Sequence, residues 1–148
     1  MTLIGEYRPS TQGWVRDQVE RFEASAGAEA NDIRGMPIVV VTSRGAKSGR
    51  LRKNPVMRVE HDGEYAVVAS KGGAPRHPQW FHNLVADPVV ELQDGPERHE
   101  YVARLASGEE RAAWWGRAVA AYPDYAAYQE RTEREIPVFV LTRSRTPD

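Results

Sequence analysis

The sequence contains no cysteine, and only three of its 20 basic residues are lysines. Without cysteine the chain can form no disulfide, no thiolate metal site and no cysteine nucleophile. The three lysines, Lys47, Lys53 and Lys71, fall in one short central region beside glycines. Either a coding bias toward arginine leaves them there by chance, or these positions need a lysine. Composition alone leaves both readings open.

Long apolar runs and an excess of one charge are also absent. No stretch approaches the roughly 20 apolar residues of a transmembrane helix, and the first ten residues lack the order of a signal peptide. The formal net charge of −1 provides no basic surface for nucleic acid. We therefore expect a cytoplasmic protein that binds no nucleic acid. Its 148 residues, 41% of them hydrophobic, suffice for one core.

Hydrophobic periodicity and turn residues predict the secondary structure. The expected elements are a helix over 10–25, a linker over 24–31, strands over 38–42, 54–60 and 64–70, a helix over 78–86 opening with Pro78, strands over 89–93 and 97–105, a helix from a capping box at 107–110, a helix over 124–132 and a strand over 136–142. Tight turns such as Asp62-Gly63 join antiparallel strands, which argues against a Rossmann layout. The pattern predicts a mainly β, α+β fold, in which about six strands form a small antiparallel barrel with short peripheral helices.

Residues 43–53 form a glycine-containing turn with five cations and no acid. Lys47-Ser48 looks like the end of a Walker A motif, but positions 41 and 46 are not glycine, so a P-loop ATPase is not expected. Gly45 and Gly49 allow backbone N–H groups to face an anion. A solvated turn is the alternative, and the density of cations favours an anion site.

A second glycine loop spans residues 69–74, where Lys71 repeats the cationic theme. Its glycines permit close approach of a planar ligand, although a plain loop with positive φ would look the same. Tyr122, Tyr125 and Tyr128 recur at helical spacing, which is typical of core packing or of an aromatic wall for a flat ligand. No nucleophile elbow or metal-ligand spacing is present, so we expect no metal and favour the chemistry of a bound cofactor.

Three segments carry a resemblance to a known family: PIVVVTSRGAKSGRLRKNPV, ASKGGAPRHPQWFHNL with the Asp-Pro after it, and AYPDYAAYQERTEREIPV. Over residues 35–142 the sequence resembles the deazaflavin-dependent nitroreductase family, within the flavin-binding split-barrel superfamily. The resemblance implies a split β-barrel domain over 35–148, preceded by a helix and linker over 1–34 in one single-domain protein. It also implies binding of reduced coenzyme F-420, a deazaflavin with a phosphate and an oligoglutamate tail.

The resemblance assigns site residues by position. The cofactor-binding residues that it implies are Ala46, Lys47, Ser48, Arg52, Lys53, Asn54, Pro55, Val56, Met57, Val68, Ala69, Ser70, Lys71, Gln79, Trp80, Phe81, His82 and Asn83. The substrate wall that it implies is formed by Tyr122, Tyr125 and Tyr128. Two positions depart from the family: Ala46 replaces an arginine, for which Arg44 stands nearby, and Met57 replaces a tyrosine of some relatives.

The reaction implied is hydride transfer from reduced coenzyme F-420 to a quinone or to a nitro or enone acceptor. Ser70, Tyr125 and Tyr128 are the expected catalytic residues, as donors to the acceptor. Two alternatives stay open: a split-barrel reductase that uses FMN, and a non-catalytic deazaflavin carrier. A homodimer and a transient membrane-surface contact through the N-terminal helix are also considered. The mixed charges of that helix favour packing on its own barrel.

Overall fold

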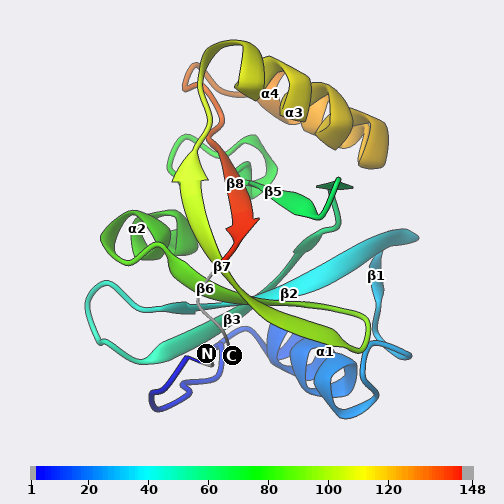
Figure 1. Cartoon of the computed structure of the whole chain (residues 1–148). Helices are drawn as coiled ribbons and strands as arrows, with labels where there is room; N and C mark the ends of the chain where they lie inside the picture. The colour runs from blue at the N-terminus through cyan, green and yellow to red at the C-terminus, as the bar shows by residue number, and fades with distance from the viewer. Residues whose placement is uncertain (1–2, 145–148) are drawn as a thin grey trace.

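The structure, a computed structural model, describes residues 3–144. Its elements, drawn in Figure 1, are α1 (Gly13–Ala24), β1 (Asp32–Ile33), β2 (Met36–Arg44), β3 (Leu51–Met57), β4 (Glu60–His61), β5 (Glu64–Val68), the short 3-10 helix η1 (Lys71–Gly73), α2 (Gln79–Ala86), β6 (Val89–Asp94), β7 (Glu97–Leu105), α3 (Gly108–Ala121), α4 (Asp124–Glu130) and β8 (Val138–Arg143). The strands form one antiparallel sheet in the order β1-β2-β6-β7-β8-β5-β4, and β3 also pairs with β2. The sheet curls so that β3 contacts β5, which confirms the predicted split barrel.

Both faces of the sheet are buried, because alternate residues of its central strands pack on different neighbours. Val39 and Val41 of β2 face the barrel interior, whereas Ile38 and Val40 face α1. Figure 1 shows α1 at one end of the sheet and α3 with α4 at the other. The apolar side of α1, formed by Val15, Val19 and Phe22, therefore packs on its own barrel, as expected.

The strands differ in extent from the prediction. Eight strands are present between residues 3 and 144, instead of about six, because β1 and β4 are two-residue strands. The third strand begins at Leu51 rather than 54, since residues 51–53 pair with Thr42, Ser43 and Arg44 of β2. Part of the predicted cationic turn therefore belongs to a hairpin, and only residues 45–50 connect its strands.

One predicted helix start is confirmed without its capping hydrogen bond, and another is shifted by one residue. Ser107 is the N-cap of α3 but makes no capping hydrogen bond with its side chain. Both carboxylate oxygens of Glu110 instead accept hydrogen bonds from Arg104 of β7, so the capping box does not form. Pro78 is the N-cap of α2 rather than its first residue, with an extended ψ of 155°.

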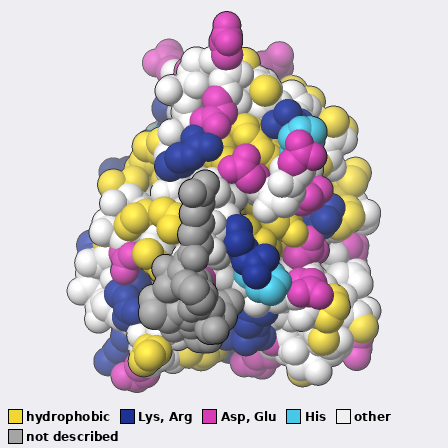
Figure 2. All heavy atoms as spheres, viewed as in Figure 1, with side chains coloured by type: hydrophobic (Ala, Val, Ile, Leu, Met, Phe, Trp, Pro, Cys, Tyr) yellow, Lys and Arg dark blue, Asp and Glu magenta, His cyan; other side chains and the backbone are white. Residues whose placement is uncertain are grey.

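Basic and acidic side chains are interspersed over the face drawn in Figure 2, in keeping with a net charge of −1. Of the helices within residues 3–144, none combines the length and the apolar character that crossing a bilayer requires.

Candidate functional site

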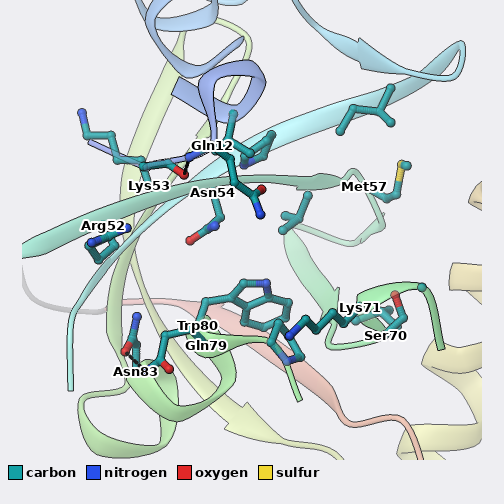
Figure 3. Close-up of a pocket in the computed structure, with 18 of the residues that line it drawn as sticks. Gln12, Arg52, Lys53, Asn54, Met57, Ser70, Lys71, Gln79, Trp80 and Asn83 are labelled. Atoms are coloured by element: carbon teal, nitrogen blue, oxygen red, sulfur yellow. Dashed lines mark hydrogen bonds between the residues drawn. The ribbon is translucent and has the colours of Figure 1, made fainter. Parts of the chain in front are cut away.

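A groove of about 780 Å³ opens between β3, α2, the η1 loop and the N-terminal segment. Figure 3 shows Lys53, Asn54 and Met57 of β3 on one side of it, across from the α2 residues Gln79, Trp80 and Asn83. Pro55 is tolerated in β3 because a strand at a sheet edge can lack an N–H donor. The volume lies in the usual range for a cofactor or small-molecule site.

The charged side chains of the groove all carry one sign. Six cations line it: Arg8, Arg34, Lys47, Arg52, Lys53 and Lys71. No aspartate or glutamate of the described chain is among the lining residues. A cleft with charges of one sign and low-dielectric walls concentrates ions of the opposite sign. The nearly neutral protein thus contains a groove that attracts anions, although Lys53 and Arg34 are each paired with an acid outside the lining.

The turn at residues 45–50 adds backbone donors to these cations. The N–H of Gly45 donates to the Arg50 carbonyl over 2.7 Å, and the N–H of Ala46 donates to Asn83 Oδ1 over 3.0 Å. In residues 3–144 no hydrogen-bond acceptor is found for the N–H groups of Lys47 and Ser48. These two donors are therefore available to an anion in the groove.

Arg44 does not replace the missing arginine at position 46. Its guanidinium donates to the carbonyls of Gly49 and Ile4 and pairs with Asp87 over 3.4 Å. These contacts hold Arg44 outside the groove lining. Arg44 therefore does not take the place of the family arginine in the groove; it ties the turn to the N-terminal segment and to the end of α2.

The loop after β5 has an unusual backbone. Lys71, Gly72 and Gly73 have φ values of +46°, +64° and +81° in succession. Ser70, only 7% exposed, lines the groove, and its hydroxyl finds no hydrogen-bond partner in the described part of the chain. Ser70 and Lys71 thus present a free hydroxyl and a cation at the same end of the groove (Figure 3).

The three tyrosines are both core and groove wall. Tyr122 and Tyr125 belong to the cluster beneath α3, and all three line the groove. The Tyr122 and Tyr128 hydroxyls are hydrogen-bonded over 2.8 Å, while that of Tyr125 has no partner among residues 3–144. Burial, with the hydrogen bond to Tyr128, raises the pKa of Tyr122 to about 12. Burial also raises the pKa of Tyr125, so the phenols of Tyr122 and Tyr125 are both protonated at neutral pH.

The structure brings most predicted site residues together. Fifteen of the 18 predicted cofactor residues and all three tyrosines line the groove. Ala69, Phe81 and His82 do not. Ala69 is fully buried in the core, Phe81 packs on Phe139 with ring centres 5.6 Å apart, and His82 is exposed. Side chains next to a groove residue point in other directions, both on a helix such as α2 and at the end of a strand, so sequence adjacency does not place them in the groove.

Sequence reasoning missed the N-terminal contribution to the groove. The segment before β2 supplies Arg8, Ser10, Thr11, Gln12, Trp14, Val15, Ile33 and Arg34. It also engages a predicted cofactor residue, since Glu23 of α1 lies 2.6 Å from Lys53 Nζ. No motif marks these residues; the pairing of the N-terminal segment with Leu51, the packing of α1 and the pairing of β1 with β2 place them at the groove.

Comparisons with known proteins identify the family of the chain. The model of a family described as F420H(2)-dependent quinone reductase matches residues 14–143. An F420H(2)-dependent quinone reductase of Mycobacterium tuberculosis is 38% identical over 126 residues, which are 82% of this chain and 85% of that protein. A solved F420-H2 dependent reductase is 55% identical, with a TM-score of 0.68 over 71% of this chain and 93% of that one. Another solved structure, described as a domain-swapped dimer, is 49% identical, with a TM-score of 0.71, and the match covers 89% of this chain and 99% of that one. The chain belongs to the F420H(2)-dependent quinone reductase family.

Proposed function

We propose that the groove binds reduced coenzyme F-420 and that the chain catalyses the reduction of a quinone by it. The observation that carries this proposal is the donor set of the groove. Arg52 and Ser70 lie toward opposite ends of the groove (Figure 3). Cations and two free backbone N–H groups gather near Arg52, whereas the tyrosine wall, with the free hydroxyl of Tyr125, lies against the loop that carries Ser70. A flat ring on a polyanionic tail matches both ends, so the residues present fit the cofactor.

The residues that line the groove are suited to bind the cofactor and to orient its ring. Lys47, Arg52 and the Ser48 N–H are suited to hold phosphate and carboxylate oxygens through charge-assisted hydrogen bonds. Trp80 and Met57 supply apolar surface for a ring from opposite sides of the groove (Figure 3). When bound, the cofactor supplies a hydride; the protein contributes position and electrostatics.

Two hydroxyls are free to serve the acceptor. Ser70 comes from the end of β5 and Tyr125 from α4, and neither has a hydrogen-bond partner within residues 3–144. A donor held at the acceptor oxygen stabilises the negative charge that develops there. Burial raises the pKa of Tyr125, so its phenol is protonated at neutral pH. It is the proton donor of this proposal because its hydroxyl lines the groove without a partner among residues 3–144.

The acceptor class extends to other flat electrophiles. Nitroaromatic and enone compounds share the planar shape and the electron-poor centre of a quinone, so they fit beside the same tyrosines. Trp14, 59% exposed, lies at the groove, so a quinone in a membrane surface would meet it first. Co-sedimentation with lipid vesicles, compared between the wild type and Trp14→Ala, tests this contact.

The homodimer is a separate proposal. Its support is the similar protein whose solved structure is described as a domain-swapped dimer. The mass measured by light scattering over a range of concentrations tests it, and a constant mass of about 16.6 kDa would contradict it.

Binding and turnover are tested separately. Equilibrium dialysis against F-420 and FMN is expected to show retention of F-420, and retention of FMN alone would overturn the cofactor assignment. Stopped-flow oxidation of bound reduced F-420 by menadione is expected to require the protein. Tight binding without oxidation would identify a carrier rather than a reductase.

A further inference from the structure

Arg134, in the segment between α4 and β8, is hydrogen-bonded to residues on both sides of the η1 turn that follows β5. Its Nη2 donates to the Ser70 carbonyl over 2.7 Å, its Nη1 to that of Ala69 over 3.1 Å, and its Nε to that of Ala74 over 2.8 Å. Nη1 also lies 3.0 Å from Nδ1 of His77. Arg134 does not line the groove, so it reaches the loop from behind.

The loop needs such support because its backbone is strained. Lys71 has a φ of +46°, a left-handed conformation that is unfavourable for a residue other than glycine. Two internal hydrogen bonds, from the N–H of Gly73 to Ser70 and from that of Ala74 to Lys71, close the turn. Strained conformations persist where the surroundings over-determine them. The four contacts of Arg134 are the surroundings that do so here.

The contact with His77 depends on the protonation of its ring. A guanidinium can only donate, so Nδ1 of His77 accepts and the imidazole is neutral, with its proton on Nε2. The groups facing the ring are Arg134, the His82 ring at 6.3 Å and the Phe81 ring at 4.1 Å. Burial and the charge of Arg134 both lower the pKa of His77. A proton on Nδ1 would remove the acceptor and set two cations against each other.

We propose that Arg134 is the positioning residue of the loop that carries Ser70 and Lys71, and that its hold on the loop is complete only while His77 is neutral. Ser70 and Lys71 line the groove, so a loosened loop misplaces one hydroxyl and one cation. The consequence for the coenzyme rests on the proposed function, whereas the order of the loop does not.

Hydrogen exchange of the protein without cofactor tests whether Arg134 positions the loop. In Arg134→Lys, which keeps the charge but not the fork of donors, the amides of Gly73 and Ala74 should exchange at least about tenfold faster. Amides of β8 should keep their protection. Arg58→Lys is the matched control, because Arg58 is also hydrogen-bonded, to Asp94, but lies outside the groove lining. Equal loop protection in Arg134→Lys and the wild type would overturn the assignment.

The dependence on neutral His77 is tested by measuring hydrogen exchange as a function of pH in the wild type and in a second variant. Corrected for intrinsic rates, exchange of the two loop amides in the wild type should accelerate as the pH falls from 7.5 to about 5. His77→Gln offers an acceptor that does not titrate, so its loop exchange should show no such step. The same acceleration in His77→Gln would overturn the role of His77. This variant leaves Arg134 in place, so the test stands even if Arg134→Lys does not fold.

Cofactor binding supplies the functional readout. At pH 7.5, Arg134→Lys should bind F-420 about tenfold more weakly while Arg58→Lys binds like the wild type. Unchanged affinity in Arg134→Lys would contradict the link between loop and groove. Failure of the wild type to bind F-420 would overturn the proposed function instead, and the exchange results on the loop would remain.

Discussion

The hydroxyl oxygens of Tyr122 and Tyr128 lie 2.8 Å apart in the groove wall. Arg34 Nη1 lies 3.3 Å from the same Tyr122 oxygen and 3.3 Å from Asp124. Because arginine only donates, Tyr122 accepts from Arg34, which favours donation of its own proton to Tyr128. A residue of the β1–β2 turn is thereby joined to α4 through two phenols.

The phenol pair should stabilise the protein measurably. Tyr122→Phe, Tyr128→Phe and the double variant, compared by urea denaturation at pH 7, should give a coupling free energy of about 1 kcal/mol. The pKa of Tyr122 is raised from 10.0 to about 12 in the folded state, so its contribution is complete below pH 10 and is lost as the pH rises toward 12. Strictly additive single effects would contradict the pair.

Tyr125 should matter more for turnover than the paired phenols. Its hydroxyl is the one without a partner in the described wall, so Tyr125→Phe removes a donor that no other contact occupies. We expect roughly a 100-fold lower kcat with menadione and little change in F-420 affinity. Tyr122→Phe serves as the control, since it removes a hydroxyl already bonded within the protein. Equal kcat values for these two variants would remove Tyr125 as the proton donor.

The three lysines should behave differently from one another. Lys47 and Lys71 line the groove and have no ion-pair partner within residues 3–144. Lys47→Ala and Lys71→Ala should therefore weaken F-420 binding roughly three- to tenfold at low salt and less at high salt. Lys53 is held 2.6 Å from Glu23 and 4.7 Å from the centre of the Tyr7 ring.

Lys53→Ala should accordingly affect the attachment of α1 more than the cofactor. Its binding loss should be smaller than that of Lys47→Ala, with a larger loss of stability in urea. Glu23→Gln is the matched variant, because it releases Lys53 toward the groove and should leave F-420 binding equal or tighter. Salt-independent losses in all three lysine variants would speak against a charge-based role.

Local patterns predicted the frame of the site better than its details. The short apolar strand segments and the tight turn at Asp62-Gly63 predicted a barrel of antiparallel strands, which the structure confirms. The capping box at Ser107 is a detail that the local sequence predicted wrongly. The capping-box sequence is present, but the carboxylate of Glu110 is engaged by Arg104 from a neighbouring strand. Tertiary competition of this kind leaves no trace in a four-residue pattern.

The groove itself depends on contacts across long stretches of sequence. Arg34 meets Tyr122, 88 residues away, and Arg134 meets Ser70, 64 residues away. A motif search locates residues that a family shares at fixed spacing, and it found the turn at 45–50 and the tyrosines. The predicted helix over 10–25 carries no such motif, so nothing placed it at the groove, which its residues reach because Phe22 and its neighbours dock on β2.

That docking predicts a large cost for one substitution. Phe22 is 1% exposed and packs with Ile38 and Val40, so Phe22→Ala should lower the free energy of unfolding by about 3–5 kcal/mol. Trp14→Ala, which changes an exposed aromatic on the same helix, should cost far less. A small effect of Phe22→Ala would mean that α1 is an appendage of the barrel rather than part of its core.

Alanine substitutions at two adjacent glycines of the η1 loop distinguish the effect of backbone strain from that of close packing. Gly72 and Gly73 both have positive φ, so an alanine is strained at either position. A Cβ on Gly72 meets nothing within 4 Å, whereas a Cβ on Gly73 would lie 2.5 Å from the Tyr128 carbonyl oxygen. Gly73→Ala must therefore push the loop away from α4, and Gly72→Ala need not. We expect Gly72→Ala to cost about 1 kcal/mol and Gly73→Ala at least twice that in urea denaturation, with F-420 binding impaired in Gly73→Ala alone. Equal losses in the two variants would show that the loop is not pressed against α4.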